Sequence, residues 1–481
     1  MSLMSVFIRE QQRYTKKDLK SIFNCDTQEI TILIKKLKAF GVLKSVKKTD
    51  YQYSLSDLVY SDTEIIDDDE NSDYCFYVFI YVGVIVCGDT VIKIYPKYIL
   101  DKNAEPLHEM RQVIKVLEKY NRDEQIINIY SGQGENKNIN IIALMLFILR
   151  DYFEYGLYAN QEEITEINGE GNILWEKTIN ESFTYISQNR PYYTELYTKK
   201  IVDDDFDYFT RLHSFIVTDC SNQIKSSQLD SLFDIETIEI SESKLDNFGT
   251  RETILDRIYK ELTIQFNTRK QLLLKAIYAY ICLGKKLNDG DYGLSMFGTN
   301  SFNLVWEKMC AAVFDNRLNC EIDELGLSLN KKYNSKKLIE VIQKPEWHRG
   351  GVIKQAHETL TPDIVSFYKK DNKRIFIIFD AKYYNIRVEQ NILEGNPGIS
   401  DITKQYLYQL AFKSITDEFD DVKNCFLMPT ELDSVIDYGT ARLEMLSSLD
   451  LKDIQVRLLP AKLISSYFLE NKKIDLDILK L

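Results

Sequence analysis

The chain has 481 residues, which is too long for one ordinary hydrophobic core, so we expect several domains. Its 44% hydrophobic and 28% charged residues are typical of a globular protein and exclude a largely disordered chain. The formal net charge of -13 excludes a protein that coats nucleic acid with its whole surface, but it is compatible with a local basic face. The cysteines form no CxxC pair, so neither a zinc site nor a disulfide framework is predicted.

The sequence also lacks the patterns of several other protein classes. The longest apolar run, 74–88, is interrupted by Gly83 and is shorter than the ~20 residues of a membrane-spanning helix, so we expect no membrane segment. The N-terminus lacks the basic and then apolar pattern of a signal peptide, which favours a cytoplasmic protein. There is no GxxxxGK[ST], HExxH or GxSxG motif, so a P-loop, zinc hydrolysis and Ser-His-Asp catalysis are poorly supported.

The first segment carries two helical patterns and then a strand pattern. Thr15 is expected to cap a short helix, and Asp26 or Thr27 a longer one that ends at Gly41. A β-hairpin over residues 43–55 is expected to follow. This order resembles a winged helix-turn-helix, so we predict such a module over residues 4–58.

The charge of this module supports a role in DNA binding. Between residues 13 and 48, ten cations exceed three anions and leave a local charge of +7. The cations are Arg13, Lys16, Lys17, Lys20, Lys35, Lys36, Lys38, Lys44, Lys47 and Lys48, and the anions are Asp18, Asp26 and Glu29. A winged helix would place its second helix in the major groove, which makes Lys35, Lys36 and Lys38 candidate DNA contacts. A protein-interaction module with a solvated basic face is the alternative.

The next part of the chain mixes strand and helix patterns. An acidic linker is predicted over residues 59–73, followed by strands up to about residue 99. Helical periodicity covers about 107–160 and 250–285, and the stretch between them, 161–245, is predicted as short strands with polar turns. We therefore predict an α+β middle region over 74–284, which recognises DNA or binds a partner. The whole chain is predicted to be a mixed α/β multidomain protein.

The stretch "TPDIVSFYKKDNKRIFIIFDAKYY", residues 361–384, reads as a β-hairpin with charged ends. If Asp371-Asn372 is a two-residue turn, the numbers of opposite residues add up to 743, and Asp363 then faces Asp380. Because side chains alternate along a strand, Lys382 shares the face of Asp380, whereas the Ala381 side chain turns away.

Two carboxylates beside an ammonium group suit phosphodiester hydrolysis. Carboxylates are the ligands that Mg²⁺ prefers, and Mn²⁺ is expected to substitute for it. The bound cation neutralises phosphate charge and lowers the pKa of the attacking water. A lysine nearby can polarise the phosphate or hold the water. The alternative is a strand that reaches solvent, in which Asp380 and Lys382 form an ordinary exposed ion pair.

The spacing of Pro362-Asp363 and Asp380-Ala381-Lys382 resembles the PD-(D/E)xK nuclease motif. Upstream, "FGTNSFNLVWEKMCAAVF" has an apolar helical stripe and carries Glu307, similar to the acidic residue that such nucleases often hold before the catalytic hairpin. Downstream, Gln405 and Tyr408 in "DITKQYLYQLAF" are similar to the glutamine and tyrosine of RecB-like members, although their spacing departs from Gln-x-x-x-Tyr. We predict a PD-(D/E)xK restriction-endonuclease-like core over residues 285–481.

Further stretches of the sequence resemble one particular family of nucleases. "VGVIVCGDTVIKIYPKYI" resembles a strand pair ending in I-x-PK in McrC-type subunits. The series "FGTNSFNLVWEKMC", "WHRGG", "TPDIVSF", "FDAKYY" and "DITKQYLYQLAF" resembles the LlaJI family of restriction endonucleases. Membership implies Mg²⁺-dependent cleavage of double-stranded DNA in host defence and a cognate DNA methyltransferase. It also implies a separate GTP-hydrolysing partner of the McrB kind, which fits the missing P-loop, and it leaves a homodimer open.

The resemblance also implies roles for individual residues. Asp363 and Asp380 would hold Mg²⁺, with the Ala381 carbonyl as a further ligand and Glu307 acting through water. Lys382 would orient or activate the water, and Gln405 would position Lys382 or the phosphate. Four residues upstream of the first aspartate are candidate contacts to the DNA backbone: His348, Arg349, Lys354 and His357.

Two alternatives remain open at this point. The chain could be another PD-(D/E)xK nuclease, of transposition or repair, or a DNA-binding regulator whose nuclease core is inactive.

Overall fold

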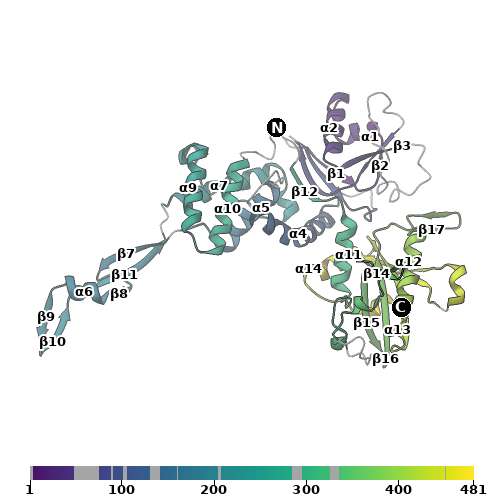
Figure 1. Ribbon diagram of the computed structural model, residues 1–481. Coiled ribbons are helices and arrows are strands. Elements are labelled where there is room, and N and C mark those ends of the chain that lie inside the picture. Colours follow the sequence, from purple (N-terminus) through teal and green to yellow (C-terminus); the bar gives the residue numbers. More distant parts are fainter. Residues whose placement is uncertain are drawn as a thin grey trace. The chain divides into compact units, whose positions relative to one another are not determined.

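The computed structural model describes residues 4–47, 75–87, 90–100, 106–130, 141–159, 161–203, 207–283, 295–325, 335–449 and 451–481. The protein is mixed α/β, as predicted, and it divides into two compact units (Figure 1). One unit comprises residues 1–123 with 290–481, and the other comprises residues 124–289. Within the described part of the chain, no helix is long and apolar enough to cross a membrane.

Both helices predicted near the N-terminus are present. Helix α1 (Lys16–Ile22) begins after Thr15, whose side chain accepts a hydrogen bond from the Asp18 amide. Helix α2 (Thr27–Ala39) begins after Asp26, whose carboxylate accepts from two amides of the first turn. Gly41 follows the second helix with φ +68°, a left-handed conformation that glycine adopts without strain.

The predicted hairpin after these helices is described only in its first strand. Strand β3 (Leu43–Lys47) pairs antiparallel with β4 (Cys75–Phe79), which also pairs with β2 (Arg13–Tyr14). The rest of the predicted hairpin, and the acidic linker over 59–73, lie outside the described residues. The assignment as a winged helix therefore remains a prediction.

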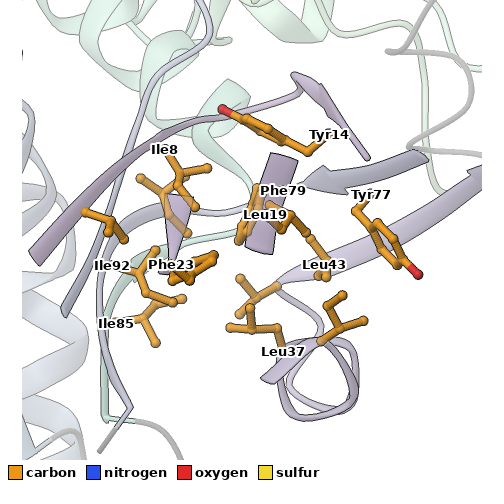
Figure 2. Packing of buried hydrophobic residues seen from close by; sticks show 14 of the residues in the cluster. Ile8, Tyr14, Leu19, Phe23, Leu37, Leu43, Tyr77, Phe79, Ile85 and Ile92 are labelled. Atoms are coloured by element: carbon orange, nitrogen blue, oxygen red, sulfur yellow. The ribbon is translucent and has the colours of Figure 1, made fainter. Parts of the chain in front are cut away.

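A second N-terminal sheet has the order β1-β6-β5-β12. It consists of β1 (Met4–Arg9), β6 (Thr90–Tyr95), β5 (Val82–Cys87) and β12 (Ser295–Thr299), and β1 is parallel to β6. Figure 2 shows the buried cluster beneath it, in which Ile8, Leu19 and Phe23 meet Phe79 and Ile85. Residues from both sides of the predicted linker thus share one core.

The unit of residues 124–289 is mainly helical. Helix α4 (Leu107–Tyr130) continues into this unit from the other one. The main helices within the unit are α5 (Ile141–Tyr155), α7 (Tyr208–Ser226), α8 (Asp230–Phe233), α9 (Arg251–Ile264) and α10 (Thr268–Leu283). The prediction of strands and turns throughout 161–245 is wrong for helix α7. Buried polar residues such as Thr210, His213 and Ser221 interrupt the apolar stripe that would have indicated this helix.

An arm of strands projects from these helices (Figure 1). It contains β7 (Gln161–Ile167), β8 (Asn172–Ile173) and β11 (Tyr197–Asp203), then α6 (Trp175–Glu181) and the hairpin of β9 (Thr184–Ser187) and β10 (Arg190–Tyr193). The strands predicted in this region are therefore confirmed on both sides of α6, whereas α6 itself was not predicted.

The C-terminal part is built on a five-stranded sheet with the order β15-β16-β19-β21-β20. Strand β15 (Ile364–Lys370) is antiparallel to β16 (Lys373–Ala381), and β16, β19 (Asp421–Thr430) and β21 (Ile454–Pro460) are parallel. Strands β19 and β21 carry the apolar runs "KNCFLMPT" and "IQVRLLP", most of whose residues are buried. The edge strand β20 (Ile436–Ala441) was not predicted, because its partly exposed sequence IDYGTA has no strong strand pattern.

Helices cover this sheet. They are α11 (Phe302–Val313), α12 (Ile399–Ala411), α13 (Lys413–Thr416) and α14 (Ala461–Leu469). Phe376 and Ile378 of β16 pack with Tyr408 and Phe412 at the end of α12. Phe379, which faces the other way, meets Phe314 just after α11. Asp380 and Lys382 continue the face of β16 that α12 covers.

Short elements complete the described structure. Two exposed hairpins flank the catalytic candidates in sequence: β13 (Glu346–Arg349) with β14 (Val352–Gln355), and β17 (Arg387–Glu389) with β18 (Ile392–Glu394). The 3-10 helices are η3 (Leu245–Phe248), η4 (Ile322–Leu325), η6 (Leu338–Val341), η7 (Glu444–Leu449) and η8 (Leu476–Leu479).

Candidate active site

The register predicted for the central hairpin is the register in the structure. Ile364 pairs with Phe379 and Lys370 with Lys373, so each opposite pair adds up to 743. Asp371 and Asn372 form the turn with φ of +49° and +63°, the left-handed pair that a type I′ hairpin turn requires. The turn chemistry therefore sets which residues meet at the other end of the hairpin.

Asp363 and Asp380 meet at that end. The backbone amide of Ala381 donates to Oδ2 of Asp363 at 3.0 Å, which fixes the first carboxylate against the end of β16. Asp380 is 4% exposed. Burial, the hydrogen bond with Asp363 and its negative charge raise the pKa of Asp380 to about 8, although Lys382 acts in the opposite direction. Two carboxylates this close disfavour simultaneous ionisation unless a cation lies between them.

Lys382 is held by two carboxylates. Its Nζ lies 3.1 Å from Oδ1 of Asp380 and 3.1 Å from Oδ1 of Asp401, and its side chain is 21% exposed. The alternative of a strand end reaching solvent with an exposed ion pair is therefore wrong. Burial opposes the charged lysine, but Asp380, Asp401 and Asp363 outweigh burial and raise the pKa of Lys382. The lysine is thus a fixed cation at neutral pH.

Asp401 is a site residue that sequence reasoning missed. It lies in the first turn of α12, where its Oδ2 also accepts a hydrogen bond from the Gly398 amide at 3.2 Å. One carboxylate therefore joins the start of the helix to the lysine. One feature of the sequence could have indicated Asp401: it lies one helical turn before Gln405, on the same face of the helix.

Gln405 and Tyr408 have different surroundings in the structure. The hydroxyl of Tyr408 donates to the carbonyl of Thr361 at 3.0 Å, which ties α12 to the segment leading into Asp363. Gln405 is fully buried, and among the described residues neither atom of its side-chain amide has a hydrogen-bond partner. It makes no hydrogen bond to Lys382 here, so its predicted role in positioning Lys382 or the phosphate stays a prediction.

Helix α11 brings Glu307 to the edge of the site. The indole Nε1 of Trp306 donates to the carbonyl of Leu427 at 3.1 Å, and Leu427 is the register partner of Ala381. Glu307, the next residue, is half-buried. Its pKa is raised, mainly because burial disfavours the charged carboxylate; the positive charge of Lys382 opposes this rise and the negative charge of Asp380 adds to it. These interactions place Glu307 within electrostatic reach of both groups.

Asn316 is a second residue that the sequence did not indicate. Its Nδ2 donates to the carbonyl of Asp363 at 2.8 Å, and its Oδ1 accepts from the amide of Val365 at 3.1 Å. The side chain thus substitutes for a neighbouring strand at the start of β15. It holds the backbone of Asp363 from the side opposite β16.

A buried polar cluster follows directly after Lys382. The hydroxyl of Tyr383 donates to the carboxylate of Glu10, and the amide of Lys97 donates to the same carboxylate at 3.1 Å. The ammonium of Lys97 donates to Gln11 at 2.8 Å and lies 4.5 Å from the centre of the Tyr383 ring. The lysine of the I-x-PK stretch therefore joins the N-terminal strands to the residue after Lys382.

The predicted DNA contacts lie on two separate elements. In α2, Lys35 is exposed, whereas Lys36 and Lys38 are half-buried, and Lys38 lies 5.4 Å from the ring centre of Tyr77. His348, Arg349 and Lys354 lie on the exposed hairpin β13–β14, and His357 follows it, also exposed.

The donor set suits a hard divalent cation. Within the described ranges, no three His, Cys, Asp or Glu side chains converge on one metal position. Two adjacent carboxylates, supplemented by backbone carbonyls and water, are nevertheless what Mg²⁺ prefers, because it retains several waters. The raised pKa of Asp380 follows from the same burial and the same contact with Asp363, and a cation beside the pair would oppose it.

Comparison with known proteins identifies the class. At one strand end of a mixed sheet, the buried Asp380 and the half-buried Asp363 meet a paired lysine, a set of groups that can hold a hard cation beside a phosphodiester. Residues 81–462 match the LlaJI restriction endonuclease family, and the chain belongs to this family. It is accordingly a restriction-system nuclease.

The chain is also similar to individual proteins. One is the Type II restriction enzyme BsuMI component YdjA of Bacillus subtilis (strain 168), which is 27% identical over 99% of this chain and 92% of its own length. Two are solved structures from Thermococcus gammatolerans. A half-complex of McrB AAA+ hexamers with bound McrC has a TM-score of 0.37, 13% identity and coverage of 97% of this chain and 99% of that chain. The McrBC complex has a TM-score of 0.27, 16% identity and coverage of 64% and 86%.

Proposed function

We propose that this chain hydrolyses phosphodiester bonds of double-stranded DNA with Mg²⁺, through a PD-(D/E)xK site formed by Asp363, Asp380 and Lys382. The observation that carries the proposal is the convergence of the buried Asp380, the half-buried Asp363 and a doubly paired lysine at the end of β16. Membership of the LlaJI family supports the same activity.

Asp363 and Asp380 would hold Mg²⁺, with the Ala381 carbonyl and, through water, Glu307. When bound, the ion would neutralise phosphate charge and lower the pKa of a water molecule. The protein supplies orientation. Asp380 and Asp401 use two of the three N–H donors of Lys382 and leave the third for the phosphate or the water. Since its pKa is raised, Lys382 acts as a fixed cation and hydrogen-bond donor and not as a general base.

Further parts of the proposal follow from the family. The B. subtilis relative is described as one component of a restriction enzyme, and this chain has no P-loop, which together favour a separate GTP-hydrolysing McrB-like subunit. A cognate methyltransferase would protect host DNA. Manganese is expected to replace magnesium, and the two basic regions, α2 and the hairpin β13–β14, are the proposed DNA contacts.

The test is a cleavage assay with purified chain and unmodified plasmid DNA. We expect cleavage with Mg²⁺ or Mn²⁺, loss of cleavage in EDTA, and loss in Asp380→Asn and Lys382→Met. Addition of an McrB-like subunit and GTP tests the partner, and methylated plasmid tests protection. Tight duplex binding without cleavage in any of these conditions would instead favour a DNA-binding regulator with an inactive core. Cleavage that never responds to a GTPase would favour a transposition or repair nuclease.

A further inference from the structure

The hairpin β13–β14 has two chemically different faces. Trp347 pairs with Lys354 and Arg349 pairs with Val352 across the strands. Because opposite residues share a face and neighbours alternate, these four side chains lie on one face, which we call the Trp347 face. The other face carries Glu346, His348, Ile353 and Gln355.

The Trp347 face combines an aromatic ring with cations and has no anion. Trp347 is 74% exposed and Val352 is 56% exposed, and both cations are exposed as well. The carboxylate of the hairpin belongs to the other face, where Glu346 lies 3.5 Å from His348 and accepts a hydrogen bond from Gln355 at 3.0 Å. A face with two cations in a protein of net charge -13 favours a polyanion.

The hairpin is also built to project. Gly350 and Gly351 form its tip with φ of +55° and +81°, and a Cβ added at either position would meet no atom within 4 Å. Its base is closed by the amide of Ala356, which donates to the carbonyl of Pro345 at 2.8 Å. A two-stranded ribbon of this kind fits the major groove, which is about 12 Å wide.

The position of the hairpin in the chain places it near the catalytic candidates. The segment from Gln355 to Asp363 spans at most about 28 Å even when fully extended. Thr359, within this segment, donates through its hydroxyl to the carbonyl of Gln343 at 2.8 Å, which holds the connection close to the start of the hairpin. The end of the hairpin therefore lies within about 28 Å of Asp363, which is less than one helical turn of duplex DNA at ~34 Å.

We propose that the Trp347 face binds the duplex beside the cleaved bond: Arg349 and Lys354 contact phosphates, and the indole of Trp347 packs against bases in the groove. The inference rests on the proposed function in taking DNA as the substrate. It goes further by separating the four predicted contacts, since His348 lies on the opposite face beside Glu346. Cations contact the phosphates of a duplex, and an exposed apolar ring beside them can contact the base edges in the groove.

The test measures binding of the full chain to a labelled 30-base-pair duplex in EDTA across a range of KCl concentrations. In the Arg349→Gln, Lys354→Gln double variant, the slope of log affinity against log salt should become shallower by about 1.8, since each phosphate contact contributes about 0.9. In Trp347→Ala, affinity should fall by about tenfold with the slope unchanged, because an uncharged apolar contact with base edges in the groove is lost. Duplex DNA should also quench part of the tryptophan fluorescence of the wild type, and this quenching should be absent in Trp347→Phe.

The matched control is the hairpin β17–β18. It is equally exposed, but Arg387 is paired with Glu389 at 2.7 Å, so Arg387→Gln with Val388→Ala should change neither slope nor affinity. Wild-type binding by both Trp347-face variants, from a wild type that cleaves DNA, would overturn this inference alone. The variants could also bind DNA like the wild type and cleave normally alone, but fail to show the cleavage that the wild type shows with an added partner subunit. The face would then contact a protein, and the inference would also be overturned. A wild type that neither binds nor cleaves DNA would overturn the proposed function itself.

Discussion

The ammonium of Lys382 lies 3.1 Å from a carboxylate oxygen of Asp401, the residue that also caps the first turn of α12. The helix that follows the hairpin β15–β16 is therefore tied directly to the lysine. Because Asp380 pairs with the same ammonium at the same distance, Lys382 has two anchors, one from each side of the site.

This relationship predicts the behaviour of Asp401→Asn. Asparagine can still accept the hydrogen bond from Gly398, so the helix should form normally, but the charge that orients Lys382 is lost. We expect single-turnover cleavage to slow by about tenfold, equivalent to about 1.4 kcal/mol, with DNA affinity unchanged. Asp475→Asn, which alters the cap of a distant short helix, is the control and should cleave normally. Unchanged cleavage by Asp401→Asn would mean that Lys382 needs no second anchor.

The raised pKa of Asp380 predicts a pH-dependent stability. A carboxyl group whose pKa rises on folding, from about 3.9 to about 8, favours the folded state at low pH, and this contribution is lost as the pH rises through 8. In EDTA, the melting temperature of the wild type relative to Asp380→Asn should therefore fall between pH 6 and pH 9.

Magnesium should reverse that trend. Its binding requires ionised carboxylates, so it should raise the melting temperature of the wild type more at pH 9 than at pH 6, and should have little effect on Asp380→Asn. Thermal unfolding with and without Mg²⁺ measures both effects. An equal magnesium effect at the two pH values would show that no proton leaves the carboxylate pair.

Asn316 predicts a link between stability and catalysis. Asn316→Ala removes both hydrogen bonds that hold the backbone around Asp363 and leaves partly buried groups unpaired, which should lower the free energy of unfolding by about 1–3 kcal/mol. Cleavage measured where the variant remains folded should also be slower, because Asp363 is less well oriented. Urea unfolding and cleavage rates provide the two readouts. A variant that loses stability but cleaves at the wild-type rate would limit Asn316 to a structural role.

Tyr383 predicts a contribution from the N-terminal strands. Tyr383→Phe keeps the ring above Lys97 but removes the hydroxyl bonded to the buried Glu10, and should cost about 1–3 kcal/mol of stability. Tyr467→Phe, which alters an only partly buried tyrosine of α14, should be close to neutral and serves as the control. Equal unfolding free energies for wild type and Tyr383→Phe would contradict the importance of this cluster.

Local sequence was enough to predict the elements that carry the site. The two helix caps near the N-terminus, the type I′ turn at Asp371-Asn372 and the pairing that brings Asp363 opposite Asp380 all depend on residues close together in the chain. A two-residue turn leaves only one register, and side-chain alternation then decides which residues share a face. The same local reasoning failed for α7, where buried polar residues mask the helical period.

Only the tertiary structure decided which distant groups complete the site. Asp401 reaches Lys382, Asn316 clamps Asp363, and Glu10 meets Tyr383 across long separations in sequence. None of these pairs has a periodic signal, because each depends on how separately formed elements pack against one another. The carboxylates, the lysine and the hairpin that presents them follow from local sequence, whereas the contacts that hold them in place follow from packing between distant elements.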